Sequence, residues 1–238
     1  SALTSLDKKN VRDGIKLGID WIALSFIQSP DDIKDLRKIC VKNTPIIAKI
    51  EKPTALNFIK DITKLADGLM IARGDLGVEL PIQDVPGWQK RIIREARIQG
   101  KPVIVSTQML ESMTYSPTPT RAEVSDVATA VFEGADAVML SGESAVGVNP
   151  ELAVKMMKNI AMSAERNPNY NSILSAQLEE TPDSTPDAIA TAASTLATEL
   201  NSPMIICYTQ SGSTGIKVSR VRPQQLILTV TPIIKTAR

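Results

Sequence analysis

The 238-residue sequence predicts an α/β protein built on a parallel sheet, because short apolar segments alternate with amphipathic helical segments. The apolar segments are strand-length and rich in Ile, Val, Leu and Met, as expected for strands buried on both faces of a parallel sheet. About five such units fill residues 18–165. A helical bundle with apolar loops does not explain the alternation. The pattern leaves open whether the sheet is open or closed, but five units cannot close an eight-stranded barrel alone.

Five segments are the expected strands of this first part, each bounded by polar, Gly or Pro residues. They are 19–26 (IDWIALSF), 45–50 (PIIAKI), 68–72 (GLMIA), 101–106 (KPVIVS) and 135–140 (ADAVML). A break in apolar character at both ends of such a segment indicates where a buried strand stops.

The helical segments between the strands carry recognisable ends. Ser29 followed by Pro30 predicts an N-cap and a proline in the first helical position. Thr120 and Glu123 form a Thr-x-x-Glu capping box, and Gly134 is placed to end the same helix. Apolar spacing predicts further helices across 55–65, from Trp88 to Gly100, and from Asn149-Pro150 onward.

A polar segment with two prolines separates this part from a second α/β part. We therefore expect a first domain over 1–165, a linker or hinge over 166–185 and part of a second domain over 186–238. The second part is expected to contain a helix at about 187–200, strands at 203–209 and 226–231, and a helical stretch near 215–220.

The composition excludes several classes of function. A net charge of +1 gives no electrostatic footprint for nucleic acid or an anionic membrane. There is no bilayer-length apolar run and no recognisable signal peptide, and the two cysteines form no metal or redox spacing, so we expect a cytoplasmic protein without disulfides. With no histidine in the chain, a bound metal is expected to be a hard cation held by oxygens.

Polar residues follow each expected strand of the first part. They are Ser25; Lys49 and Glu51; Arg73, Gly74 and Asp75; Ser106, Thr107 and Gln108; and Ser141, Gly142 and Glu143. The carboxyl ends of parallel strands lie at one face, where α/β enzymes build their sites. We therefore expect these clusters to converge on one rim.

Glu51 and Asp75 are the candidate metal ligands on this rim. Two carboxylates about 4 Å apart repel by roughly 4 kcal/mol at an effective dielectric constant near 20, and a divalent cation removes that cost. Oxygen ligands favour Mg²⁺ or Mn²⁺. Lys49 shares a strand face with Glu51 and would present a fixed cation to an anionic substrate. The alternative, a structural Lys49–Glu51 ion pair, is equally compatible with the spacing.

The other residues of the rim have simpler expected roles. Gly74 allows close approach of a backbone amide, and Thr107 offers a hydroxyl. Arg73 is expected to be structural, through an ion pair or a subunit contact, and Glu143 is also expected to be structural. The Arg-Gly-Asp tripeptide is not expected to serve cell adhesion, because Asp75 follows a strand and is not at an exposed loop tip.

Several segments together resemble the pyruvate kinase family. They are IIAKIEKP (46–53), DGLMIARGDLGVELP (67–81), the segment GKPVIVSTQMLESMTYSPTPTRAEVSDVATAVFEGADAVMLSGES (100–144) and TQSGSTGIKVSRVRP (209–223). The resemblance implies a partial TIM (β/α)8 barrel, with strands 4–8, followed by an incomplete α/β C-terminal domain. The first three strands and the lid domain of the family would then be missing from this sequence.

The resemblance implies phosphoryl transfer from phosphoenolpyruvate to ADP, giving pyruvate and ATP in the last step of glycolysis. Lys49 matches the family's catalytic lysine, and Glu51 and Asp75 match its ligands for Mg²⁺ or Mn²⁺. The amides of Gly74 and Asp75 and the hydroxyl of Thr107 are expected to bind the substrate carboxylate. A water near Thr107 would protonate the enolate. The family also implies K⁺, with ligands outside this chain.

The resemblance also implies an effector and an assembly. Thr209, Ser211, Gly212, Ser213 and Thr214 match the family's sugar-phosphate effector loop, and a homo-oligomer, usually a tetramer, is expected. Gln210 replaces a lysine seen in some members activated by fructose 1,6-bisphosphate. Composition alone slightly favours a capped turn here, although helix N-termini bind phosphate well.

Two other functions stay open on the sequence alone. One is a non-catalytic fragment that binds metal or oxalate, or oligomerises, without turnover. The other is a different metal-dependent enzyme acting on pyruvate or phosphoenolpyruvate, such as an aldolase. The full set of matching segments argues against the aldolase.

Overall fold

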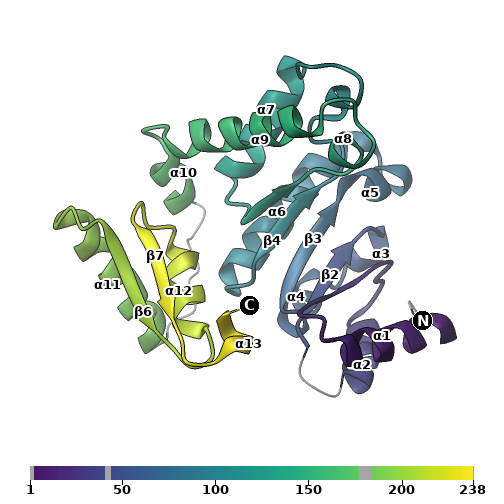
Figure 1. Ribbon diagram of the computed structural model, residues 1–238, viewed down its shortest axis with the longest axis horizontal. Helices are drawn as coiled ribbons and strands as arrows, with labels where there is room; N and C mark the ends of the chain where they lie inside the picture. The colour runs from purple at the N-terminus through teal and green to yellow at the C-terminus, as the bar shows by residue number, and fades with distance from the viewer. Residues whose placement is uncertain (1–2, 41–43, 177–183, 238) are drawn as a thin grey trace. The chain divides into compact units, whose positions relative to one another are not determined.

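The computed structural model describes residues 3–40, 44–176 and 184–237. The chain divides into two compact units. The first comprises residues 1–97 and 101–177, and the second comprises 98–100 and 178–238. Helices and strands carry the labels of Figure 1.

The first unit is built on a five-stranded parallel sheet with strand order β1-β2-β3-β4-β5 (Figure 1). The strands are β1 (Ile22–Leu24), β2 (Ile46–Ile50), β3 (Gly68–Ala72), β4 (Val103–Ser106) and β5 (Ala137–Met139). All five predicted strands are present, and β3 has the predicted bounds. The outer strands β1 and β5 are shorter than predicted, because within the described residues each pairs with one neighbour only.

The register of the sheet brings the ends of its central strands level. Ile50 at the end of β2 pairs with Ile71 of β3, and Ala72 at the end of β3 pairs with Ser106 at the end of β4. The residue after each of these three strands is therefore a polar one at the same edge. These residues are Glu51, Arg73 and Thr107.

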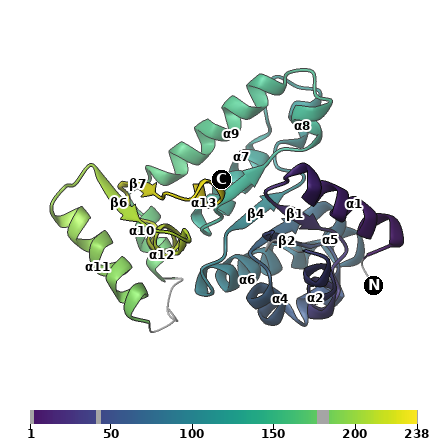
Figure 2. The ribbon, with the colours of Figure 1, turned by 60° about the horizontal axis from the view of Figure 1, so that its bottom comes forward.

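Helices follow the strands, and Figure 2 shows α2, α4 and α6 following one another along the sheet. The helices of this unit are α1 (Ser5–Leu17), α2 (Pro30–Ile39), α3 (Pro53–Leu56), α4 (Ile59–Leu65), α5 (Arg73–Glu79), α6 (Val85–Ile98), α7 (Arg121–Phe132), α8 (Gly142–Ala145), α9 (Pro150–Glu165) and α10 (Tyr170–Ala176), with 3-10 turns η1 (Ile82–Asp84) and η2 (Glu111–Thr114). The N-cap of α2 at Ser29 and the capping box of α7 are confirmed.

Some helices differ from the prediction. The single helix expected across 55–65 is two helices, because Phe58 leaves the helical region (φ −117°, ψ 18°) between α3 and α4. The expected linker at 166–185 contains α10, and its residues 177–183 lie outside the described residues. The sequence reasoning missed α1, although Thr4 and Asp7 form a capping box at its start.

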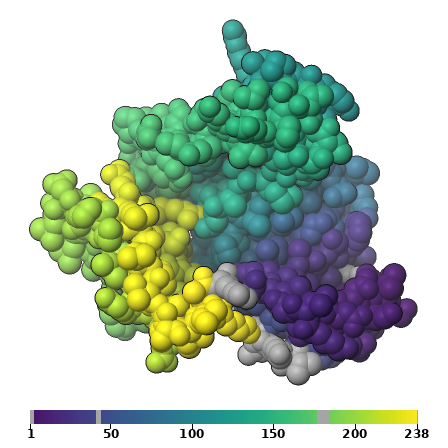
Figure 3. Space-filling view, in the orientation of Figure 1, coloured from purple at the N-terminus to yellow at the C-terminus, as the bar shows by residue number. Residues whose placement is uncertain are grey.

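The core of the first unit lies between the sheet and these helices. Ile33 and Leu36 of α2 and Ile92 and Ile93 of α6 are fully buried together with the strand residues. Helix α9 reaches the surface in the space-filling view (Figure 3), with Leu152 and Val154 exposed and its opposite face buried. The apolar stripe on its buried face packs α9 against α7 and α8.

The second unit contains two parallel strands, β6 (Met204–Tyr208) and β7 (Leu226–Val230). Its helices are α11 (Thr185–Glu199), α12 (Ser213–Val221) and α13 (Ile234–Ala237). Its buried core is small and centres on Ala190, Cys207 and Val218. Gly215 of α12 lies so close to β7 that a Cβ there would be 2.4 Å from Thr229 Oγ1. Among the described residues, no helix is long and apolar enough to cross a membrane.

Candidate active site

Lys49 and Glu51 form an ion pair at the carboxyl end of β2. Lys49 Nζ lies 2.7 Å from Glu51 Oε1 and donates a hydrogen bond to Ser25 Oγ at 2.9 Å. The second carboxylate oxygen, Glu51 Oε2, accepts a hydrogen bond from the Phe26 amide at 2.7 Å. Glu51 is only 2% exposed, whereas the side chain of Lys49 is 25% exposed. The lysine therefore bridges a buried carboxylate and the solvent-facing edge of the sheet.

Asp75 lies in the first turn of α5, which follows β3, and is exposed. Within the described part of the chain, no hydrogen bond or ion pair engages its carboxylate. Glu51 and Asp75 thus follow neighbouring strands, one carboxylate buried and paired, the other free. No group of three or more His, Cys, Asp or Glu that could hold a metal occurs among the described residues.

This donor set fits Mg²⁺ or Mn²⁺ on chemical grounds. Mg²⁺ typically binds one or two protein carboxylates and completes its shell with water and substrate oxygens. Two carboxylates without any nitrogen or sulfur donor would meet that requirement. The two oxygens of Glu51 contact the ammonium group of Lys49 and the Phe26 amide, so a metal would have to share one of them.

Gly74 and Thr107 touch one another at the ends of β3 and β4. The Gly74 amide donates to Thr107 Oγ1 at 2.7 Å, and that hydroxyl donates to the Ser106 carbonyl at 2.6 Å. A Cβ at position 74 would lie 3.4 Å from Thr107 Oγ1. The amide and the hydroxyl that the sequence reasoning assigned to one carboxylate are therefore adjacent.

The guanidinium of Arg73 is largely buried and contacts several groups. It donates to the carbonyl of Thr107 from Nε at 3.3 Å and from Nη2 at 2.9 Å, and to the carbonyl of Gln108 at 3.0 Å. It also forms an ion pair with Asp126 at 2.6 Å. A structural role for Arg73 through an ion pair or a subunit contact was expected; the ion pair is present, but its partner Asp126 lies 53 residues away in the sequence and had no local signal.

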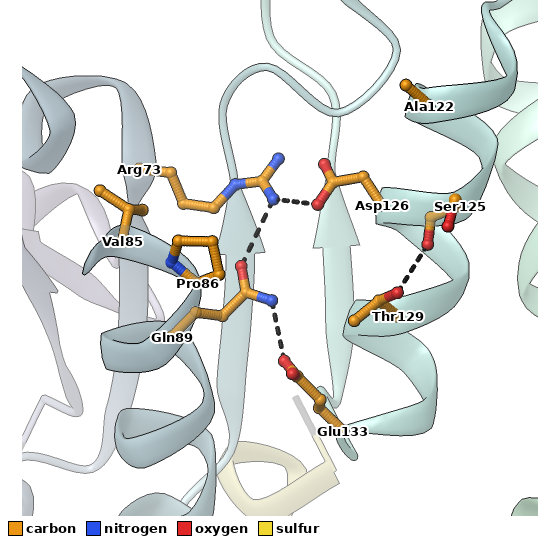
Figure 4. Close-up of a pocket in the computed structure, with 9 residues that line it drawn as sticks. All are labelled: Arg73, Val85, Pro86, Gln89, Ala122, Ser125, Asp126, Thr129 and Glu133. Carbon is orange, nitrogen blue, oxygen red and sulfur yellow. Dashed lines mark hydrogen bonds and ion pairs between the residues drawn. The ribbon is translucent and has the colours of Figure 1, made fainter. Parts of the chain in front are cut away.

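The outer side of Arg73 borders a pocket of about 370 Å³ (Figure 4). It is lined by Arg73, Val85, Pro86, Gln89, Ala122, Ser125, Asp126, Thr129 and Glu133. Gln89 accepts from Arg73 at 3.4 Å and donates to Glu133 at 2.8 Å, which links α5, α6 and the end of α7. Burial raises the pKa of the Glu133 carboxyl, and the hydrogen bond from Gln89 offsets this only in part.

Glu143 has a structural role, as expected. Its buried carboxylate accepts hydrogen bonds from the amides of Leu110 at 3.2 Å and Ser141 at 2.7 Å. It ties η2 to the start of α8 and has both oxygens occupied.

The loop at 209–214 in the second unit is closed by its own hydrogen bonds. The Gly212 amide donates to Thr209 Oγ1 at 3.1 Å, and Gly212 precedes α12 with φ 84°. Ser211 and Ser213 are exposed, and their hydroxyls lie 3.0 Å apart. Thr214 lies in the first turn of α12. This geometry is that of a capped turn, and effector binding stays a prediction.

A parallel βα sheet with its polar side chains gathered after the strands is the arrangement of (β/α)-barrel enzymes. Residues 1–154 match the family model of the pyruvate kinase barrel domain, and residues 187–238 match that of the pyruvate kinase alpha/beta domain. The chain belongs to the pyruvate kinase family. The expected fold, part of a barrel followed by an α/β domain, is confirmed.

Individual relatives agree with this assignment. A pyruvate kinase of Agrobacterium vitis is 51% identical over 238 residues, which is 100% of this chain and 49% of the relative. One of Staphylococcus aureus (strain MRSA252) is 45% identical over 99% of this chain and 41% of the relative. The crystal structure of a Cryptosporidium parvum pyruvate kinase superposes with a TM-score of 0.94 at 38% identity, covering 99% of this chain and 50% of that one. The chain spans about half the length of the curated relatives it matches.

Proposed function

We propose that this chain carries part of the active site of a pyruvate kinase, which transfers a phosphoryl group from phosphoenolpyruvate to ADP. The observation that carries the proposal is the Lys49–Glu51 ion pair at the carboxyl end of β2, with the carboxylate of Asp75, unpaired within the described residues, in the helix that follows the neighbouring strand β3. Phosphoryl transfer depends on positioning and charge neutralisation more than on covalent help from the protein. Lys49 supplies a fixed cation, and the carboxylates of Glu51 and Asp75 would supply the place for a metal.

Each residue then has a defined part. Lys49 neutralises the oxygens of the phosphoryl group in transfer, and Ser25 orients its ammonium group through the 2.9 Å hydrogen bond. Glu51 and Asp75 would hold Mg²⁺ or Mn²⁺. When bound, this cation supplies Lewis-acid stabilisation for the enolate oxygen of the product.

Gly74 and Thr107 provide the groups for the substrate carboxylate. The Gly74 amide is occupied by Thr107 Oγ1 in the structure, so substrate binding requires the carboxylate to share or replace this hydrogen bond. The amide of Asp75 is the third proposed donor. A water beside the Thr107 hydroxyl is the proposed proton donor to the enolate, since the chain has no histidine.

The remaining expectations concern the larger protein. ADP and ATP as the nucleotide pair, K⁺ with ligands outside this chain, a homo-oligomer and a cytoplasmic location follow from the family. A sugar phosphate at the 209–214 loop is tested by titrating fructose 1,6-bisphosphate and ribose 5-phosphate at millimolar concentration. The absence of any binding signal would exclude an effector site in this chain.

The test of the main proposal is Mn²⁺ and oxalate binding, followed by a lactate-dehydrogenase-coupled assay of pyruvate formation. Oxalate imitates the enolate of pyruvate. Because the chain spans half the length of its relatives, we expect binding of both with little turnover. Binding of neither would contradict the proposed site. Robust turnover would support the site but refute the expectation that these 238 residues are nearly inactive alone.

A further inference from the structure

Arg73 connects the pocket of Figure 4 with the residue proposed to bind substrate. Its side chain is 10% exposed, and its guanidinium contacts Asp126 and Gln89 (Figure 4). It also donates to the carbonyls of Thr107 and Gln108. Nη2 also lies 2.9 Å from the sulfur of Met109. The side chain thus contacts three consecutive residues after β4.

The segment that it holds has an unusual backbone. Thr107 and Gln108 both have positive φ, 67° and 53°. Side chains other than glycine rarely adopt this left-handed region, and a β-branched residue such as threonine is particularly strained there. Two such residues in succession turn their carbonyls toward Arg73, whose three hydrogen bonds to those carbonyls offset the strain.

The position of the guanidinium is in turn set by helices α6 and α7. Nη1 of Arg73 donates to a carboxylate oxygen of Asp126 on α7 at 2.6 Å. Gln89 of α6 is itself held in place by donating to a carboxylate oxygen of Glu133 at 2.8 Å. A lysine has no planar fork and would not reach the two carbonyls and the carboxylate at once. The arrangement therefore requires arginine.

We infer that Arg73 is a positioning residue for substrate binding, acting through Thr107 without touching the substrate. By holding the Thr107–Gln108 backbone in the left-handed region it keeps the Thr107 hydroxyl beside the Gly74 amide, so that the two proposed donors stay together for a substrate carboxylate to share or replace the hydrogen bond between them. The inference rests on the proposed function of Gly74 and Thr107.

The experiment compares Arg73→Lys with the parent chain and with Arg91→Met as the control. Arg91 is exposed on α6 and stacks on Trp88, with its guanidinium carbon 4.2 Å from the ring centroid. Two quantities are measured for each variant. The first is binding affinity, measured for Mn²⁺ alone and then for oxalate with Mn²⁺ bound. The second is the rate of amide hydrogen exchange in the peptides covering 72–79 and 105–113.

We expect Arg73→Lys to weaken oxalate binding at least tenfold while the Mn²⁺ affinity changes less than twofold. Exchange at 106–110 and at the Gly74 amide should accelerate at least tenfold, and Arg91→Met should change neither quantity. In a Thr107→Val background the effect of Arg73→Lys on oxalate should disappear, because residues that act through one another are not additive.

Three results would overturn the inference: unchanged exchange protection at 106–110 in a folded Arg73→Lys variant, equal losses of Mn²⁺ and oxalate affinity, or fully additive effects with Thr107→Val. If Arg73→Lys does not fold, Asp126→Asn removes the charge that pairs with Arg73. The same oxalate, Mn²⁺ and exchange measurements are then made on that variant. If the parent chain binds neither Mn²⁺ nor oxalate, the proposed function fails and the inference fails with it, while the exchange measurement still shows whether Arg73 holds the backbone at 106–110.

Discussion

The ammonium group of Lys49 lies 2.7 Å from a carboxylate oxygen of Glu51, and this glutamate is almost fully buried. The lysine therefore occupies one of the oxygens that the proposed metal would use. The ammonium group and the proposed metal would compete for the same carboxylate, so the charge at position 49 should influence metal affinity as well as catalysis.

Lys49→Met should make Mn²⁺ binding at least as tight as in the parent chain while abolishing any phosphoryl transfer. Without metal, the buried Glu51 loses its counter-charge, and the free energy of unfolding should fall by about 3 kcal/mol. Mn²⁺ at about 100 times its Kd should restore about 2.7 kcal/mol. Calorimetric titration and urea unfolding followed by the fluorescence of Trp21 and Trp88 measure both effects.

The matched variant is Glu51→Gln, which should lower Mn²⁺ affinity at least tenfold. A Glu51→Gln chain that binds Mn²⁺ as tightly as the parent would show that Glu51 is not a metal ligand and that the pair is purely structural. Weaker Mn²⁺ binding by Lys49→Met than by the parent would refute the competition between lysine and metal.

Gly74→Ala should leave the fold intact and selectively weaken oxalate binding. The added methyl group would lie 3.4 Å from Thr107 Oγ1, at the limit of ordinary contact, and alanine is favourable in a helix. The methyl group occupies the space beside the amide where the substrate carboxylate is proposed to bind. We expect at least a tenfold loss of oxalate affinity with Mn²⁺ affinity unchanged, and equal oxalate binding would exclude Gly74 from the substrate site.

Glu123→Ala should lower the free energy of unfolding by about 2 kcal/mol, which is more than the loss of a single helix-capping hydrogen bond usually costs. Burial raises the pKa of Glu123, but hydrogen bonds from Ser112 and Thr120 outweigh this and leave the pKa below its ordinary value. The substitution would remove the hydrogen-bond acceptor of the Ser112 amide and that of the Thr120 amide at the N-terminus of α7. Urea unfolding measures the change. Glu151→Ala, in the first turn of α9, is the control and should stay within about 0.5 kcal/mol.

Asp187 should make the second unit sensitive to acid. Its side chain is 7% exposed and lies 2.7 Å from Lys217 and 3.5 Å from Arg220. Burial raises its pKa, but the hydrogen bonds from Lys217 and Ser184 and the charge of Arg220 prevail and lower the pKa below its ordinary value. The ordinary pKa of an aspartate in the unfolded chain is about 3.9. A carboxylate whose pKa is lower in the folded state stabilises the fold above that pH, and this stabilisation is lost as the pH falls through the folded-state pKa.

Asp187→Asn should therefore cost about 3 kcal/mol at pH 7, and the difference from the parent chain should narrow below about pH 4. Thermal unfolding monitored by circular dichroism between pH 7 and pH 3 tests this. The exposed Glu199 of the same helix, changed to Gln, provides the control. A difference that is constant with pH would show that the charge of Asp187 contributes nothing.

Much of the fold was predictable because its signals are local. Strand β3 matched its predicted bounds, since its five consecutive buried residues lie between the charged residues Asp67 and Arg73. The capping box at Thr120 marked the start of α7. Lys49 and Glu51 were expected on one face because side chains alternate along a strand, and their ion pair confirms it.

What only the tertiary structure decided is how distant segments meet at the site. Nothing near Arg73 in the sequence indicates Asp126, and no residue preference predicts left-handed backbone at Thr107. Such a conformation is unfavourable locally and persists only because contacts from elsewhere hold it. The amino-acid sequence by itself determined the presence of the five strands, the starts of α2 and α7 and the family. The packing of α5, α6 and α7 around the guanidinium of Arg73 decided the backbone of residues 107–108, because the groups that stabilise it are brought together only by folding.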